Sequence, residues 1–450
     1  MTVSSVNVSE LINARRLSKY QVGVLLLCAL AALMDGYDSV IIGITGPAIA
    51  RSLSLDIKSF GPVFSAAQFG FMLGAFMAGP LADRLGRKRI LIVSVVAFGL
   101  FSILTPFAES YRQLLGLRFI TGLGLGGAAT AFVAMCAEYS PLRVKARILT
   151  ILWVLVPAGN VVGGLLSSVI LPSQGWALVY YIGGVVPLVI AEVMIWIIPE
   201  SLQFLVATNA PPRRVASVIA RIAPDLAVGS ATRYTSSEGR SLTKSVRHLF
   251  SDGRAPITMC IWISFFCCWL VLITLLAWTA PVLREAGVPI AKASLMISVN
   301  SGGAMLGAPL IGWAMDRADR FSVVGLGLFG GAIAVAAIGF AADSYERLMV
   351  CYFLAGALVG GTSAGMMALV ATLYPTAVLS TGIGWAIGVA RLGAIVGPTL
   401  FGLLLAAGWT LPLLFTTLGI VVLISALSIA GLRAAIRRRP GALTTPATTA

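Results

Sequence analysis

Twelve long apolar stretches dominate this sequence and leave the chain few ways to fold. A helix needs about 20 mostly apolar residues to cross a bilayer. Only 11% of the 450 residues are charged, whereas soluble domains carry about 25%. We therefore predict an all-α membrane protein with twelve transmembrane helices. They are expected at residues 21–46, 60–82, 90–108, 113–138, 147–171, 178–198, 256–283, 293–315, 322–342, 347–373, 379–406 and 411–433.

The positions of the Lys and Arg residues predict the orientation of these helices. With both termini, the long central polar stretch and the loops after helices 2, 4, 8 and 10 on one side, that side holds 24 of the 32 basic residues. The other side holds six, and Arg118 and Arg391 lie within helices. Cytoplasmic loops of membrane proteins carry such an excess. Both termini are therefore expected in the cytoplasm, and the net charge of +15 needs no nucleic-acid partner.

The longest polar stretch separates six predicted helices from six that resemble them. "RFITGLGLGGAATAFVAMCAEYSP" in the first half is echoed by "YFLAGALVGGTSAGMMALVATLYP" in the second. Parallel repeats of this kind place a substrate site at their interface, near the bilayer midplane. The expected parts are a cytoplasmic N-terminus at 1–20, a six-helix bundle at 21–198, a cytoplasmic loop at 199–255, a second six-helix bundle at 256–433 and a cytoplasmic tail at 434–450.

The segment Asp35-Gly36-Tyr37-Asp38 lies inside the first apolar stretch. An ionised carboxylate at the bilayer centre costs at least ~3 kcal/mol on insertion scales. The two acids are three residues apart and share one helix face. That face is expected to meet a water-filled cavity or a protein partner, which favours a transport pathway. The alternative is a carboxylate pair that only bonds to neighbouring helices.

Arg118 and Arg391 are the two basic residues inside predicted helices. A buried guanidinium stays charged, so it needs a carboxylate, a backbone cage or an anionic ligand. No acid lies within the second six helices away from their ends. Arg391 is therefore expected to meet Asp35, Asp38 or the carboxylate of a substrate, which a guanidinium binds through two parallel bonds.

Further side chains are candidates for the lining of a central cavity, with packing or interface anchoring as the alternative for each. An aromatic ring or an amide inside a span can meet a substrate or fill a helix contact equally well. These residues are Tyr37, Trp278, Asn300 and Trp385.

The loop after helix 2 reads "GPLADRLGRKR" and is expected to gate the transport cycle. Its Asp can accept bonds from the nearby Arg residues or from a helix N-terminus, and such a bond would hold one conformation. Glu138 lies about 30 Å from Arg118 along its helix, so it is expected to join this loop through Arg84 or Arg87. A purely topogenic charge cluster is the alternative. The predicted gating residues are Asp83, Arg84, Gly86, Arg87 and Glu138.

Little in the chain suggests catalysis or metal binding. The six cysteines lie in apolar stretches without metal or redox spacing, and the one histidine, His248, lies in a polar loop. We expect no enzyme activity, no metal site and no cofactor other than a coupling proton.

These motifs together resemble a known transporter family. The loop after helix 2 resembles the G-x-L-a-D-r-x-G-r-k signature of the major facilitator superfamily, and Arg118 resembles its helix-4 arginine, which that family links to proton coupling. The segment "DGYDSVIIGITGPAI" is similar to the start of the aromatic acid:proton symporters. Arg118, Glu138 and Arg391 match charged positions of that branch, and Asp83 matches its loop acid. The chain departs from the pattern in helix 8, because residues 293–315 contain no histidine.

The resemblance implies two pseudo-symmetric six-helix bundles and a monomeric symporter in the bacterial inner membrane. It would import a benzoate-like carboxylate with a proton. Which acid is carried, how many protons accompany it, and which of Asp35 and Asp38 takes a proton are left open. An effluxer or antiporter of organic anions and a transporter-like sensor are the alternatives. Proton coupling is assigned to Asp35, Asp38 and Arg118, and substrate binding to these three with Tyr37, Trp278, Asn300, Trp385 and Arg391.

Overall fold

The computed structural model describes residues 5–223, 233–235, 246–251, 253–341, 343–374 and 376–438. Within this part of the chain, twelve helices are long and apolar enough to cross a membrane, as the sequence predicts. Most of the predicted tail at 434–450 and much of the second half of the predicted loop at 199–255 lie outside the described residues.

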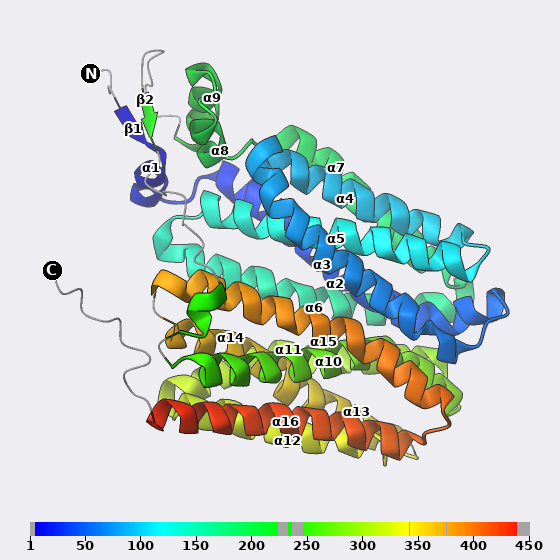
Figure 1. Cartoon of the computed structure of the whole chain (residues 1–450). Helices are drawn as coiled ribbons and strands as arrows, with labels where there is room; N and C mark the ends of the chain where they lie inside the picture. Colours follow the sequence, from blue (N-terminus) through cyan, green and yellow to red (C-terminus); the bar gives the residue numbers. More distant parts are fainter. Residues whose placement is uncertain are drawn as a thin grey trace. The chain divides into compact units, whose positions relative to one another are not determined.

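The first six spans begin at Lys19 and end at Ile197 (Figure 1). Some of them include a short 3₁₀ turn, such as η1, which directly precedes α3. They are α2 (Lys19–Ser52), η1 (Ile57–Phe60) with α3 (Gly61–Leu85), α4 (Arg87–Leu104) with η2 (Thr105–Phe107), α5 (Tyr111–Tyr139), α6 (Leu142–Gln174) and α7 (Ala177–Ile197).

The second six spans follow the same plan, except that the fourth contains a π-helical turn, η4. They are α10 (Ala255–Glu285), α11 (Ile290–Arg317), α12 (Arg320–Ile338), α13 (Tyr345–Ala355) with η4 (Gly356–Gly360) and α14 (Gly361–Leu373), α15 (Thr376–Ala406) and α16 (Leu411–Arg438).

Short elements lie outside the spans. They include one feature that the sequence does not signal, a parallel pair of strands with Ser5 opposite Arg233 and Asn7 opposite Thr235. The prediction of an all-α protein therefore holds for the spans, and this strand pair is an addition. The short elements are β1 (Ser5–Asn7), α1 (Val8–Ala14), α8 (Leu202–Ala207), α9 (Pro212–Ile222), β2 (Arg233–Thr235) and η3 (Val246–Leu249).

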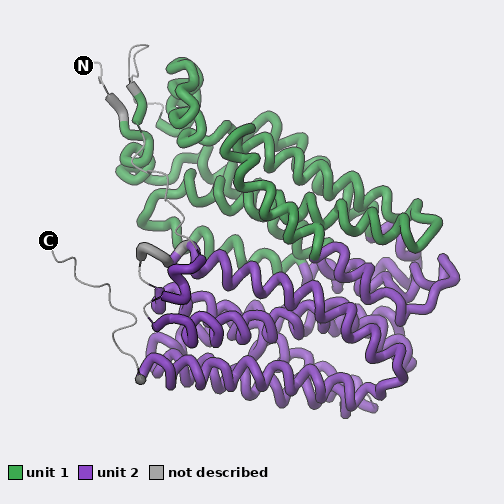
Figure 2. Tube along the Cα trace, in the orientation of Figure 1, with its two compact units in different colours: residues 1–38, 69–159, 180–241 green, residues 39–68, 160–179, 242–450 purple. Residues whose placement is uncertain are grey.

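Packing divides the chain into two compact units, shown in Figure 2. Unit 1 comprises residues 1–38, 69–159 and 180–241, and unit 2 comprises residues 39–68, 160–179 and 242–450. This division differs from the six-plus-six division expected from the sequence, because one end of α2, of α3 and of α6 belongs to unit 2.

Hydroxyl groups tie those segments into unit 2. Ser65 of α3 donates to the carbonyl of Ile395 at 2.5 Å, and its oxygen lies 2.7 Å from the hydroxyl of Thr399. Ser298 of α11 donates to the carbonyl of Val161 of α6 at 2.9 Å. Such bonds matter in an apolar environment, where a polar group finds few partners other than another helix.

Small residues allow the helices of each unit to approach closely. In unit 1, α4 packs along α5, and in unit 2, α10 packs along α15 and α16 (Figure 1). Where α11 meets α13 and η4, a Cβ on Gly303 would overlap the carbonyl oxygen of Phe353, and one on Gly356 would overlap that of Asn300. Helix association in lipid depends on such close contacts, since lipid is as apolar as the helix surface.

Replacing Gly303 by Ala should destabilise the protein, because the new methyl group would force α11 away from α13. Its neighbour Gly302 is the matched control, since a Cβ there meets nothing within 4 Å. Gly302→Ala should be neutral or slightly stabilising, because Ala favours a helix by about 1 kcal/mol over Gly. Thermal melting of the purified protein in detergent would compare them. Equal melting temperatures for both variants would contradict the packing argument.

Candidate functional site

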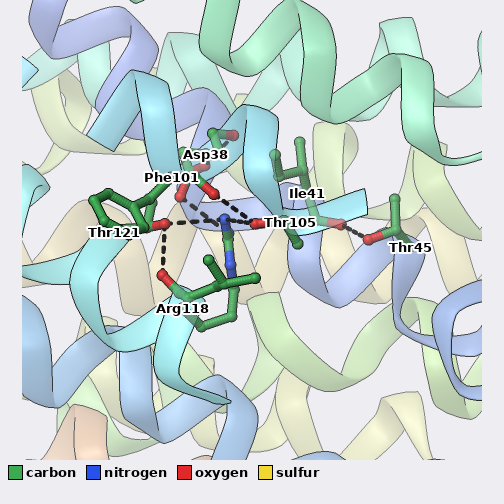
Figure 3. A network of polar contacts seen from close by, with 9 residues as sticks. Asp38, Ile41, Thr45, Phe101, Thr105, Arg118 and Thr121 are labelled. Carbon is green, nitrogen blue, oxygen red and sulfur yellow. Dashed lines mark hydrogen bonds and ion pairs between the residues drawn. The ribbon is translucent and has the colours of Figure 1, made fainter. Parts of the chain in front are cut away.

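A buried ion pair lies in the interior of unit 1. Nη1 of Arg118, on α5, lies 3.4 Å from Oδ2 of Asp38, on α2 (Figure 3). The Arg118 side chain is fully buried and that of Asp38 is 3% exposed. The sequence leaves a carboxylate, a backbone cage or an anionic ligand open as the partner of Arg118, and the structure shows the carboxylate of Asp38.

Hydroxyl groups from three helices donate to or accept hydrogen bonds from this pair. Nη2 of Arg118 donates to Thr105 at 2.9 Å and to Thr121 at 3.2 Å (Figure 3). Ser102 donates to Oδ1 of Asp38 at 3.3 Å. A buried pair is tolerated only when its remaining polar atoms are also bonded. The polar side chains of η2, α4 and α5 provide these bonds.

Aromatic rings enclose the same charges. The guanidinium carbon of Arg118 lies 5.0 Å from the centre of the Tyr180 ring, an attractive cation–π geometry. Tyr37 and Tyr180 are both buried, and Asp35 is only 5% exposed. Both acids of the first span therefore lie in the interior of the protein, as the sequence predicts.

Gly36, between the two acids, is required by packing. A Cβ at this position would overlap the carbonyl of Val156 on α6, and a Cβ on Gly159 of α6 would overlap the carbonyl of Leu33 on α2. The two glycines let the backbones of α2 and α6 touch. The motif thus combines two charges with the small residue that brings a neighbouring helix against them.

Arg391 lies in unit 2, on α15. Its Nη1 donates to Oε1 of Gln68, on α3, at 3.4 Å, and its guanidinium carbon lies 4.9 Å from the centre of the Trp269 ring, on α10. A guanidinium stacked on an aromatic face keeps its N–H groups directed along its edge, where they suit a planar carboxylate. This arrangement suits an organic anion, and the role of Arg391 in binding one stays a prediction.

The other three predicted substrate contacts have protein partners that fit the packing alternative. The indole N–H of Trp278 donates to the carbonyl of Pro398 at 2.9 Å. Nδ2 of Asn300 donates to the carbonyl of Tyr352 at 3.0 Å. The ring of Trp385 stacks on that of Trp262, with 5.5 Å between centres. Their roles in substrate binding stay predictions.

Glu138 joins the charge cluster of the loop after α3, as predicted, and its partner is Arg87. Ser201, which lies between the end of α7 and the start of α8, donates a hydrogen bond to the same carboxylate. Asp83 and Arg84 are exposed and form no ion pair with any described residue. The predicted bond of Asp83 to a neighbouring Arg is therefore not made in this structure, and the gating roles of these residues stay predictions.

Glu200 is a site residue that the sequence analysis does not identify. Its carboxylate accepts bonds from the backbone N–H groups of Lys88 and Ser201, both at 3.0 Å, and so caps the start of α4. A carboxylate is favoured there by the helix dipole. Gly86 has φ +99°, and a Cβ on it would overlap the Glu200 carboxylate. Gly86 is thus required both by its backbone conformation and by the cap.

Unit 2 has a matching cap at the start of α12. Asp319 accepts bonds from the hydroxyl of Ser322 at 2.7 Å and from its N–H at 2.9 Å, and lies 3.2 Å from Arg433 of α16. The two bonds from Ser322, with a smaller contribution from Arg433, hold the pKa of Asp319 below its ordinary value. Each unit therefore caps the third span of its half with a carboxylate close to the last span of that half.

Several further side chains around the charges were also missed. They are single polar or aromatic residues inside apolar runs, and this position is the only sign in the sequence that they have a special role. The sequence does not show which helices become neighbours, so their partners could not be predicted. They are Gln68, Ser102, Thr105, Thr121, Tyr180 and Trp269. Among the described residues, no three His, Cys, Asp or Glu side chains gather in a way that could hold a metal ion.

Comparison with known proteins agrees with this architecture. The profile of the Major Facilitator Superfamily matches residues 28–289 and 261–449. A gallate transporter of Pseudomonas putida is 34% identical over 442 residues, covering 98% of both chains. A 4-hydroxybenzoate transporter of Pseudomonas aeruginosa is 34% identical over 417 residues, covering 92% of this chain and 93% of the other.

The fold is shared with a solved transporter structure. The bacterial homolog of the human lysosomal transporter Spinster, in an inward-facing and unoccupied conformation, superposes with a TM-score of 0.73. It is 17% identical and covers 96% of this chain and 100% of its own. The protein is a multi-pass membrane transporter, not an enzyme. It belongs to the Major Facilitator Superfamily, which confirms the resemblance seen in its sequence.

Replacing Glu138 by Gln should destabilise unit 1 by about 1–3 kcal/mol, because its charged interaction with Arg87 is lost. Thermal melting in detergent would measure the change. Arg84→Gln is the matched control in the same loop and should stay within about 0.5 kcal/mol of the parent. A larger effect for Arg84→Gln than for Glu138→Gln would contradict the pairing.

Proposed function

We propose that the protein is a proton-coupled symporter that imports an aromatic carboxylate, such as a hydroxybenzoate, by alternating access. The observation that carries this proposal is the buried Asp38–Arg118 pair, which joins a proton acceptor to an anion-binding group inside a transporter. The names of the relatives support the substrate class, because gallate and 4-hydroxybenzoate are both benzoates with ring hydroxyls.

The first step is protonation of an acid of α2. Asp38 holds Arg118 at 3.4 Å only while it is ionised. A proton on Asp38 removes that attraction and leaves the guanidinium in need of another anion. The carboxylate of the substrate replaces it. Asp35, three residues earlier, is the alternative proton acceptor, and two like charges so close are easier to keep when one is neutralised.

Arg391 is the second anion-binding group. Its cation–π contact with Trp269 and its bond to Gln68 hold the guanidinium in place. One proton and one monoanion together carry no net charge, so the loaded carrier loses less hydration energy when its halves close around the substrate. The pH gradient then drives uptake more than the membrane potential does.

The transport cycle follows from the repeat. The halves at 21–198 and 256–433 rock about the loaded site and release substrate and proton into the cytoplasm. The proposed location is the bacterial cytoplasmic membrane, with both termini in the cytoplasm as the excess of basic residues favours. The carrier is proposed to act as a monomer. Asp83, Gly86 and Arg87 would open and close the cytoplasmic side.

Replacing Asp38 by Asn should abolish accumulation driven by a pH gradient, because an amide cannot take up the proton. Uptake by the parent protein should rise as the external pH falls, and this dependence should disappear in the variant. Exchange of labelled 4-hydroxybenzoate against unlabelled 4-hydroxybenzoate in proteoliposomes needs no net proton movement, so it should persist. The control is Asp343→Asn, which breaks a surface pair with Arg347. Accumulation by Asp38→Asn with the parent's pH dependence would refute the proton role.

Replacing Arg391 by Gln should raise the KM for a benzoate about tenfold or more, because a charge-assisted bond to a carboxylate contributes roughly 1.5–3 kcal/mol. Initial rates of uptake of labelled 4-hydroxybenzoate would measure it. Arg347→Gln removes a surface guanidinium and serves as the control. An unchanged KM in Arg391→Gln would remove Arg391 from the binding site.

A further inference from the structure

Among the described buried polar side chains of unit 2 that contain an atom without a hydrogen-bond partner, two lie on helices that pack against each other. Asn160, on α6, is 7% exposed, and Ser301, on α11, is 2% exposed. Oδ1 of Asn160 and the hydroxyl of Ser301 are shielded from solvent and make no hydrogen bond within the described part of the protein. Neither residue was singled out above for binding or transport.

The two side chains face the same helix seam. Ser298 of α11 donates to the carbonyl of Val161 at 2.9 Å, and a Cβ on Gly164 would meet the Ser298 hydroxyl and, at 2.9 Å, the Ser294 carbonyl. The helices run in opposite directions here, since lower numbers on α6 meet higher numbers on α11. Asn160 lies one turn before Gly164 and Ser301 lies one turn after Ser298, so both point into the seam.

The hydroxyls of Ser294 and Ser298, which lie between these helices, do have partners, whereas that of Ser167 on α6 has none among the described residues. Ser298 is bonded to Val161, and Ser294 donates to the carbonyl of Ile290 at 2.8 Å. A buried polar group without a partner weakens the fold, and more so inside a membrane, where no water replaces the missing bond. Two such groups at one level of the seam therefore indicate a place where a polar ligand atom binds.

The chemistry of the two atoms selects the ligand group. Oδ1 of an amide only accepts hydrogen bonds, whereas a serine hydroxyl both donates and accepts. A carboxylate would be repelled by the amide oxygen, and an ammonium would leave the serine proton unused. A hydroxyl satisfies both, because its O–H donates to Asn160 and its oxygen accepts from Ser301.

We propose that Asn160 and Ser301 bind a ring hydroxyl of the aromatic acid and so determine specificity for hydroxylated over unsubstituted benzoates. This inference rests on the proposed function and adds a recognition site to it. A site that hydrogen-bonds a substrate hydroxyl discriminates strongly against an analogue without one, because its own polar atoms stay unpaired when the analogue binds.

The experiment compares uptake of labelled 4-hydroxybenzoate and labelled benzoate in proteoliposomes. Ser301→Ala removes one oxygen and Asn160→Leu removes the amide at similar volume. Each should lower kcat/KM for 4-hydroxybenzoate roughly tenfold, which corresponds to about 1.4 kcal/mol, and leave that for benzoate unchanged or higher. Ser301→Thr keeps a hydroxyl and should restore the preference. Ser168→Ala is the control, since Ser168 lies on the same helix and its hydroxyl already donates to the carbonyl of Leu165 at 2.7 Å.

The outcomes separate the inference from the function on which it rests. If the parent takes up both acids and neither variant changes their ratio, the role of Asn160 and Ser301 is refuted while the proposed function stands. Equal losses for both acids refute it as well, because they indicate a structural role. Melting temperatures of all variants show whether each is folded. Uptake of neither acid by the parent refutes the proposed function and the inference together.

Discussion

The attraction between Asp38 and Arg118 is the interaction on which the interior of unit 1 depends. Each charge alone would be very unfavourable away from water, and each is tolerated because the other lies 3.4 Å away. The surrounding hydroxyls of Ser102, Thr105 and Thr121 then have to face this point. The close contact of α2 with α6 through Gly36 keeps the acids enclosed. The folded protein therefore keeps in its interior the two charges, on Asp38 and Arg118, that the proposed transport cycle uses.

The sequence predicts the spans well because their signal is local. Twelve apolar stretches, the basic loops and the acids inside the first span can each be read without knowing the fold. Glu138 was also placed correctly. Its distance from Arg118 along one helix excludes an ion pair between these two residues, and Glu138 pairs with Arg87 instead. Helix length and helix face are properties of a single segment, and they survive folding unchanged.

The neighbours of each charge could not be predicted in the same way. The sequence shows that Arg118 needs a carboxylate, a backbone cage or an anionic ligand, and only the packing of α2 against α5 shows that this partner is Asp38. Trp269, the ring under Arg391, lies more than a hundred positions away in the chain. The sequence gives no sign of the role of Glu200, because its cap on α4 depends on where α7 ends.

The boundary between the two units crosses α2 between Asp38 and Ser39. One continuous helix therefore belongs to one packing unit up to its second acid and to the other from the next residue onward. Protonation of Asp38 would weaken its attraction to Arg118 at the residue where α2 passes from one unit to the other. A change of charge on this single carboxylate therefore occurs where the backbone of α2 connects the two units.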